Sequence, residues 1–207
     1  MSAPDPPYST LIFDLSDVLI AGLWGAEKPL AQRLGVPERS VADALWIPWA
    51  FSLFEGRISE KQYLEEVIRR HAWRGISADE VGQLLRQGFL QRVDGMEDLV
   101  RALSAKYDLA LLSDHAREWV DFIRRHVPVL EVFPHQFFSF ELRHTKRERI
   151  TFLTVLYKLH RSPAECVFVD DLAVNIEVAR SVGLRAVQFK DCRQLIAAFR
   201  DLGIHAD

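Results

Sequence analysis

Short apolar runs recur along the chain and predict five buried β-strands. These runs are Thr10–Phe13, Leu109–Leu112, Gln136–Phe138, Cys166–Val169 and Ala186–Phe189. They do not alternate with polar residues, which is typical of parallel strands that helices cover on both faces.

Helical periodicity fills most of the stretches between these runs. Apolar residues spaced three and four apart predict the buried faces of helices. They are Met96, Leu99, Val100 and Leu103, then Trp119, Phe122 and Ile123, then Ile150, Leu153 and Tyr157. Another helix is expected to begin after Asp171 and to end at Gly183, which suits a position just past a helix. This alternation predicts an α/β fold with a doubly wound, Rossmann-like parallel sheet.

A long helical stretch separates the first predicted strand from the second. Helices are expected at Pro29–Leu34, Ser40–Ala50, Ser59–His71 and Ser77–Leu90. We interpret residues 22–92 as an inserted α-helical cap over the carboxyl edge of the sheet, where ligands of such sheets bind. Residues 8–21 and 93–207 then form the α/β core, and residues 1–7 are expected to be a disordered tail and not a signal peptide.

Composition narrows the class of protein. The chain has 207 residues, of which 49% are apolar and 27% are charged, as in ordinary globular proteins. Its formal charge of −3 argues against a nucleic-acid partner. The chain contains no uninterrupted run of 18 apolar residues, so the sequence predicts no membrane-spanning helix. Two cysteines and seven isolated histidines do not form a disulfide framework or a zinc motif, and we expect a cytoplasmic protein that is a monomer or a homodimer.

Polar clusters follow four of the predicted strands or lie a few residues beyond them. They are Asp14–Asp17, Ser113–Asp114, Lys146 and Asp170–Asp171. In a parallel sheet these positions gather at one edge, where several carboxylates need a counter-charge. Mg²⁺ with oxygen ligands and a phosphate meets that need. The pattern therefore indicates phosphoryl transfer, with a carboxylate as the nucleophile.

These residues resemble the four ordered motifs of the haloacid dehalogenase (HAD) superfamily. The segments are LIFDLSDVLI, LLSD, SFELRHTK with its final Lys146, and VFVDD. The segment FEGRIS resembles one found in small helical caps inserted after the first strand. The resemblance spans residues 8 to about 200, and the chain is similar to sugar-1-phosphate phosphatases and to the phosphatase-like N-terminal part of epoxide hydrolases.

The resemblance implies a metal site. Asp14 would be both nucleophile and ligand to Mg²⁺, and the backbone carbonyl of Ser16 would be a second ligand. Asp170 and Asp171 would hold the metal directly or through water. Asn175 would orient these ligands from behind.

The resemblance also implies a phosphoryl-binding site. Ser113 would hydrogen-bond to the transferring group with help from the backbone amide of Asp114, and Lys146 would steady the nucleophile and the phosphoryl oxygens. Asparagine is more usual than Asp114 in relatives. Its side chain is expected to point away from the phosphate or to pair with His115 or Arg117.

Ser16 departs from the pattern, because most phosphatases of the family carry a second aspartate there as general acid and base. Three interpretations follow. The leaving group needs little protonation, Asp17 or a cap residue supplies the proton, or the site binds metal and phosphate with little turnover. Haloacid dehalogenation is the least favoured activity, since that branch uses no metal and has an aromatic residue after its nucleophile.

The predicted cap is rich in aromatic residues. They are Trp24, Trp46, Trp49, Phe51 and Phe54. Most are expected to pack among the cap helices, and Trp24, which follows the nucleophile strand, is the best candidate to line a substrate pocket. The sequence therefore predicts a magnesium-dependent hydrolase of a small phosphorylated metabolite, acting through an aspartyl-phosphate. The alternative is a phosphate- and metal-binding or regulatory protein.

Overall fold

A five-stranded parallel sheet forms the centre of the molecule. The computed structural model describes residues 8–23, 27–46 and 48–206, so the expected tail at residues 1–7 and Trp24 lie outside the described residues. The strands are β1 (Thr10–Phe13), β2 (Asp108–Ser113), β3 (His135–Phe138), β4 (Cys166–Asp170) and β5 (Arg185–Gln188). Their order is β3-β2-β1-β4-β5, and every neighbouring pair is parallel. The predicted doubly wound sheet is confirmed.

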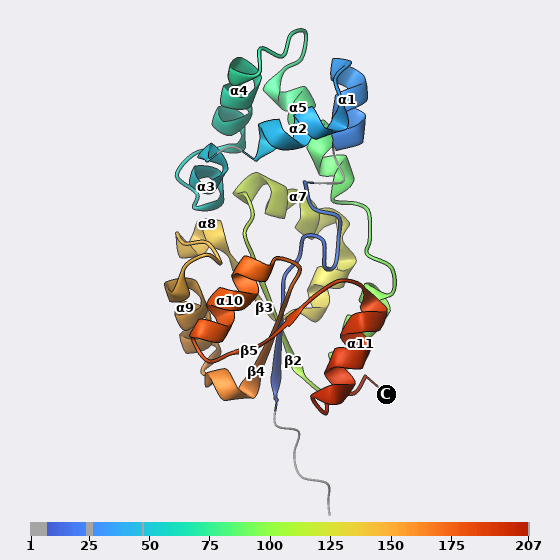
Figure 1. The fold of residues 1–207 in the computed structure, drawn as a ribbon, viewed down its shortest axis with the longest axis vertical. Helices are drawn as coiled ribbons and strands as arrows, with labels where there is room; N and C mark the ends of the chain where they lie inside the picture. Colours follow the sequence, from blue (N-terminus) through green and yellow to red (C-terminus); the bar gives the residue numbers. More distant parts are fainter. Residues whose placement is uncertain (1–7, 24–26, 47, 207) are drawn as a thin grey trace, which may run out of the picture.

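Helices cover both faces of this sheet. The helices that pack on it are α6 (Met96–Leu103), α7 (Arg117–His126), α9 (Arg149–Leu159), α10 (Ala173–Ser181) and α11 (Cys192–Asp201). Residues of α9 and α10 share one core cluster with the strands, and residues of α6, α7 and α11 share the other. Figure 1 shows α9 and α10 on one side of the sheet and α11 on the other. Short elements complete the core at Pro128–Val132, Ser139–Leu142 (α8) and Pro163–Glu165.

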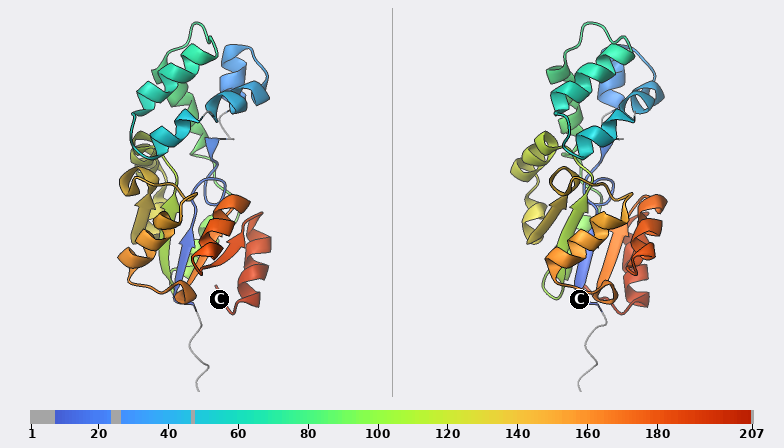
Figure 2. Two further views of the ribbon diagram at one scale, coloured as in Figure 1. Left: turned by 60° about the vertical axis from the view of Figure 1, so that its left-hand side comes forward. Right: turned by 90° about the vertical axis from the view of Figure 1, so that its left-hand side faces the viewer.

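In the described part of the chain, five helices lie between β1 and α6 and gather beyond the carboxyl ends of the strands (Figures 1 and 2). They are α1 (Glu27–Leu34), α2 (Glu38–Leu45), α3 (Trp49–Phe54), α4 (Glu60–Arg70) and α5 (Ala78–Gly88). We call α1 to α5 the helical segment. The chain enters and leaves it at one place, because Ile20 bridges Arg92 in antiparallel fashion and Ala21 N donates to Gln91 O at 2.9 Å.

Two expectations about helices are wrong. The single helix predicted at Ser40–Ala50 is two helices, α2 and α3, because Pro48 has no N–H to continue a helix and begins the next one instead. In α9, the predicted buried residues Ile150, Leu153 and Tyr157 face solvent, with Tyr157 78% exposed. The buried residues of α9 are Thr151, Phe152, Val155, Leu156 and Leu159.

None of the helices in the described part of the chain combines the length and apolar character needed to cross a bilayer.

Candidate active site

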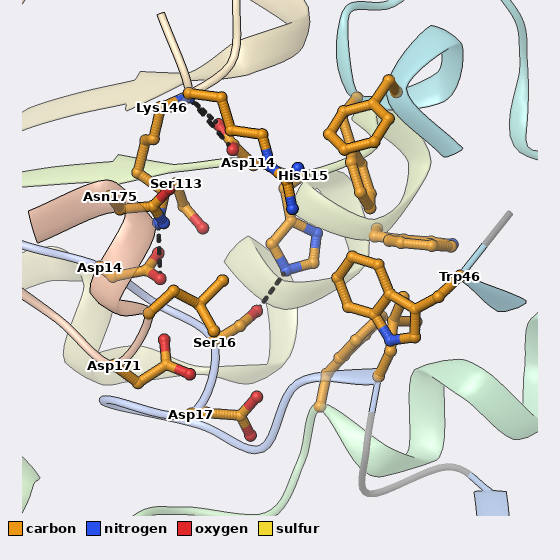
Figure 3. A pocket seen from close by; sticks show the side chains of 17 residues that line it. Asp14, Ser16, Asp17, Trp46, Ser113, Asp114, His115, Lys146, Asp171 and Asn175 are labelled. Carbon is orange, nitrogen blue, oxygen red and sulfur yellow. Dashed lines mark hydrogen bonds and ion pairs between the residues drawn. The ribbon is translucent and has the colours of Figure 1, made fainter. Parts of the chain in front are cut away.

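A cavity of about 240 Å³ opens at the carboxyl edge of the sheet, facing the helical segment (Figure 3). One end of it is polar, and its lining side chains are Asp14, Ser16, Asp17, Ser113, Asp114, His115, Lys146, Asp171 and Asn175. The remaining lining residues are apolar or aromatic apart from Arg147, and they are Leu23, Trp46, Phe51, Phe54, Phe89, Trp119, Arg147 and Leu172. The four polar clusters predicted from the sequence are therefore brought to one site.

Asp14 lies directly after β1, at the centre of the sheet. Its backbone N–H donates to Val169 O at 2.9 Å, so it continues the pairing with β4 for one residue. Its Oδ1 accepts a hydrogen bond from the amide of Leu15 at 2.7 Å, which fixes the carboxylate. Asp14 is 4% exposed and borders the cavity, so its carboxylate is held in place and still open to a ligand.

Lys146 is the buried cation of the site. Its Nζ lies 2.6 Å from Asp14 Oδ2 and 2.6 Å from Asp170 Oδ2. Burial by itself lowers the pKa of the Lys146 ammonium, but the carboxylates of Asp14, Asp170 and Asp114 outweigh it and raise that pKa. Lys146 is therefore charged at neutral pH. It forms ion pairs with Asp14, which follows β1, and with Asp170, which ends β4.

The structure gives Asp114 a partner that the sequence did not suggest. Its Oδ1 and Oδ2 accept from the backbone amide of Lys146 at 3.1 and 3.2 Å, and no described side chain pairs with its carboxylate. The predicted partner Arg117 lies over the Phe140 ring instead, at 4.6 Å. Burial raises the pKa of Asp114 to about 6, against the effect of Lys146. Asp114 thus anchors the loop that delivers the lysine.

Asp170 is fully buried at the end of β4, and neighbouring donors hold it. Asn175 Nδ2 donates to its Oδ1 and Oδ2 at 3.0 and 3.1 Å, and the amide of Leu172 donates to Oδ1 at 2.8 Å. Asn175 thus holds the carboxylate of Asp170 in place.

Asp14, Asp170 and Asp171 form a cluster that fits a metal ion. One carboxylate oxygen from each lies within 4.8 Å of the others. Burial, then the nearby charge of Asp170, raises the pKa of Asp171 to about 6. Burial also raises the pKa of Asp14, and Lys146 opposes this rise. Lys146 alone does not balance three carboxylates, and oxygen-only ligands suit a hard divalent cation.

Ser113 ends β2 and is 1% exposed. Its Oγ borders the cavity and has no hydrogen-bond partner among the residues the structure describes. Because a buried hydroxyl without a partner is costly, this atom indicates a site for a polar ligand.

Ser16 points toward the cavity two residues after Asp14. Its Oγ lies 3.2 Å from Nε2 of His115, a contact drawn as a dashed line in Figure 3. Its carbonyl, the metal ligand implied by the resemblance, accepts no hydrogen bond from the described residues. Burial, then the charge of Lys146, lowers the pKa of His115 to about 3, so the imidazole is neutral at neutral pH.

The side chain of Asp17 stabilises a turn. Its φ is +58°, and Oδ1 accepts from the Gly22 amide at 2.9 Å. Burial raises its pKa, against that hydrogen bond.

The far end of the cavity is aromatic. Trp46 meets Phe54 edge to face at 6.3 Å between ring centroids, and Trp119 packs on Phe54 at 6.1 Å. The Arg147 guanidinium lies over the Phe51 ring at 4.8 Å. The sequence predicted that most of the cap aromatic residues pack among the helices and that one or two line a pocket, and Trp46, Phe51 and Phe54 line the cavity.

Several polar contacts join the helical segment to the core. Trp119 Nε1, on α7, donates to Glu60 Oε1 at 2.7 Å, and Arg86 also pairs with Glu60. Near α8, Arg143 Nη1 donates to Gly56 O at 2.6 Å. These contacts hold the aromatic residues of the helical segment over the polar residues of the cavity.

His115, Trp119 and Arg147 line the site but were not singled out as site residues from the sequence. The position of His115 immediately after the Ser113–Asp114 pair is a signal that was available. The sequence gave no such signal for Trp119, because its spacing from Phe122 and Ile123 is that of an ordinary buried helix face.

Comparison with protein families identifies the class. A family model described as haloacid dehalogenase-like hydrolase matches residues 8–183. The chain belongs to this family of hydrolases, as the motifs predicted.

Individual relatives agree with this assignment. The chain is 24% identical over 202 residues to flavin mononucleotide hydrolase 1 of Arabidopsis thaliana, covering 94% of this chain and 78% of the relative. Its fold is similar to that of a HAD-like hydrolase from Porphyromonas gingivalis, with a TM-score of 0.77, 21% identity and coverage of 96% and 99% of the two chains. A HAD family enzyme from Bacteroides thetaiotaomicron, crystallised with magnesium and inorganic phosphate, gives a TM-score of 0.71 at 20% identity and covers 89% and 96%.

Proposed function

We propose that this protein is a magnesium-dependent phosphatase that hydrolyses a small phosphate monoester through an aspartyl-phosphate on Asp14. The observation that carries the proposal is the joint placement of Asp14, Lys146 and the unpartnered Ser113 hydroxyl around one end of the cavity. A nucleophile, a cation and a free donor around one space are what phosphoryl transfer needs. The Bacteroides enzyme with magnesium and phosphate supports it by analogy.

Asp14, Asp170 and Asp171, with the Ser16 carbonyl, would hold the metal. When bound, Mg²⁺ supplies positive charge that neutralises the phosphoryl oxygens. Lys146 contributes a fixed positive charge at the same place, and Asn175 keeps Asp170 in position. Without the metal, the single positive charge of Lys146 therefore does not balance the carboxylates of Asp14, Asp170 and Asp171.

Asp14 and a water molecule form and break the covalent bonds of the reaction. An oxygen of Asp14 attacks phosphorus and forms a P–O bond, while the ester P–O bond breaks and its electron pair leaves with the organic oxygen. Ser113 donates a hydrogen bond to a phosphoryl oxygen. Water then hydrolyses the aspartyl-phosphate, which releases inorganic phosphate and restores the Asp14 carboxylate.

We infer that the organic part of the substrate contains a planar ring. The cavity wall opposite Asp14 carries Trp46, Phe51 and Phe54, with Arg147 beside them. Aromatic side chains bind flat apolar groups through stacked or edge contacts. The helical segment thus acts as a cap that selects the substrate. The flavin mononucleotide hydrolase of Arabidopsis supports a planar ring in the substrate but not the kind of ester, because flavin is a planar ring system whose phosphate is attached to an alkyl hydroxyl group.

An assay with an aryl phosphate and Mg²⁺ tests the phosphatase proposal. Asp14→Asn keeps the size of the side chain and removes the nucleophile, so hydrolysis should fall by on the order of 10⁴-fold or more. Asp108→Asn is the matched control, because Asp108 lies at the opposite end of the sheet beside Arg161 and should leave activity unchanged. Chelation of Mg²⁺ should also abolish hydrolysis.

The alternative is a phosphate- and metal-binding or regulatory protein. It would be favoured if the wild-type protein hydrolysed none of the aryl, acyl and sugar-1-phosphates while still binding Mg²⁺. The cytoplasmic location and the monomeric or homodimeric state stay predictions.

A further inference from the structure

Ser16 and His115 form a pair that the covalent steps above do not use. The Ser16 Oγ lies 3.2 Å from His115 Nε2, and both residues line the cavity. His115 is 3% exposed, and its backbone amide donates to Ser139 Oγ at 3.0 Å. The imidazole is therefore fixed in place next to the serine.

The surroundings of His115 decide which ring nitrogen carries the proton. The ring packs against Phe89 and Trp119, with centroids 5.2 and 5.7 Å apart, and Nδ1 has no partner in the described part of the chain. A proton on Nδ1 would leave a buried N–H unpaired, which proteins rarely tolerate, whereas a proton on Nε2 leaves only a lone pair unpaired. Nε2–H therefore donates to the Ser16 oxygen.

This arrangement leaves the hydrogen of the Ser16 hydroxyl free to point into the cavity. In-line attack by Asp14 places the leaving oxygen on the far side of phosphorus, toward the cavity that Ser16 lines. We propose that His115 is a positioning residue that holds the Ser16 hydroxyl as a hydrogen-bond donor to the leaving-group oxygen. This inference rests on the proposed phosphatase function.

The consequence is a limit on the substrate. Ser16 keeps its proton, so the ester P–O bond breaks with the electron pair on the leaving oxygen, which departs as an anion and takes a proton from water afterwards. A hydrogen bond stabilises that anion but does not neutralise it. The pair therefore favours esters of weakly basic hydroxyl groups, such as phenols, over alkyl esters.

The tautomer of His115 is tested by ¹⁵N NMR of the histidine side chains in the wild-type protein. The His115 signals, assigned by their loss in His115→Gln, should show a protonated Nε2 and an unprotonated Nδ1, and Ser16→Ala should shift Nε2. A protonated Nδ1 would overturn the proposal, because the serine hydrogen would then be used to reach Nε2. This readout does not depend on turnover.

The donor role is tested with a series of aryl phosphates whose phenols differ in pKa. Ser16→Ala and His115→Phe should each lower kcat for the most basic phenols by about tenfold and leave the least basic almost unchanged, with little change in KM. The double variant should be no worse than either single one. His115→Gln offers an amide N–H for the same bond and should retain most activity. His126→Phe, on the exposed end of α7, is the matched control.

Two outcomes would contradict the donor role. A uniform loss of kcat across the series would show that Ser16 and His115 only support the fold, and an unchanged series would show that they do not contact the leaving group. Absence of hydrolysis by the wild-type protein would overturn the phosphatase function and the donor role together, while the NMR result would separately decide the hydrogen-bonded pair.

Discussion

At the scale of single residues, the site depends on buried polar side chains that contact one another or border the cavity. Asp14 and Asp170 share one lysine, while Ser113 has a free hydroxyl. The sequence predicted these four residues, because each lies at or beyond the end of a strand. It did not predict that Asp114 binds the Lys146 amide, because that bond depends on the path of the loop between α8 and α9.

Gly56 gives a residue-scale prediction about the contact between the helical segment and the core. Its φ is +65°, and a Cβ there would lie 2.9 Å from Phe140 O. Gly56→Ala should lower the free energy of unfolding by about 2–3 kcal/mol, since the cost of a left-handed alanine adds to a clash. The free energy is measured by urea denaturation.

Gly35 is the matched control for Gly56. It has a similar φ of +67°, but a Cβ there meets nothing within 4 Å. Gly35→Ala should therefore cost only about 1 kcal/mol. Equal losses for the two variants would show that the contact of Gly56 with α8 does not constrain the loop.

At the scale of elements, periodicity predicted the strands better than the helix faces. All five predicted strands are present with their ends within about a residue or two. In α9, Ile150, Leu153 and Tyr157 have helical spacing, but so do Phe152, Val155, Leu156 and Leu159. Both stripes are apolar, so only packing against the sheet decides which one is buried.

Two tryptophans near the start of α3 give an element-scale prediction. Trp46 and Trp49 are 39% and 40% exposed, but of the two only Trp46 lines the cavity. Trp46→Ala should raise KM for aryl phosphates by about tenfold and leave inhibition by inorganic phosphate unchanged, because the substitution removes a ring that would contact the organic part of the substrate and leaves the phosphoryl-binding residues in place. Trp49→Ala should change neither. Steady-state kinetics with both ligands measures this, and an equal effect of the two substitutions would argue against ring recognition.

At the scale of the whole molecule, the sheet brings together acids that are far apart in the sequence. Asp171, with a pKa raised from 3.8 to about 6, binds its proton more tightly in the folded state than in the unfolded state. Its contribution to stability is therefore lost as the pH rises through that window, and a bound cation restores it by holding the ionised form.

Magnesium should accordingly raise the melting temperature more at about pH 7.5 than at about pH 5. At 100 times Kd the gain is about 2.7 kcal/mol, which corresponds to about 5–10 °C for a chain of this size. Differential scanning fluorimetry measures the shift. Asp171→Asn should remove most of it, and a magnesium shift that is the same at both pH values would contradict the carboxylate site.

The antiparallel bridge between Ile20 and Arg92 has a consequence for how much the inserted helices can vary. Because the chain leaves the sheet and returns to it at the same point, the insertion between these residues does not thread through the core. Its length can therefore change without moving the strands and their acids, provided that the contacts of Glu60 and Gly56 with the core are kept. Replacement of this single insertion would leave Asp14, Lys146 and Asp170 where the sheet holds them.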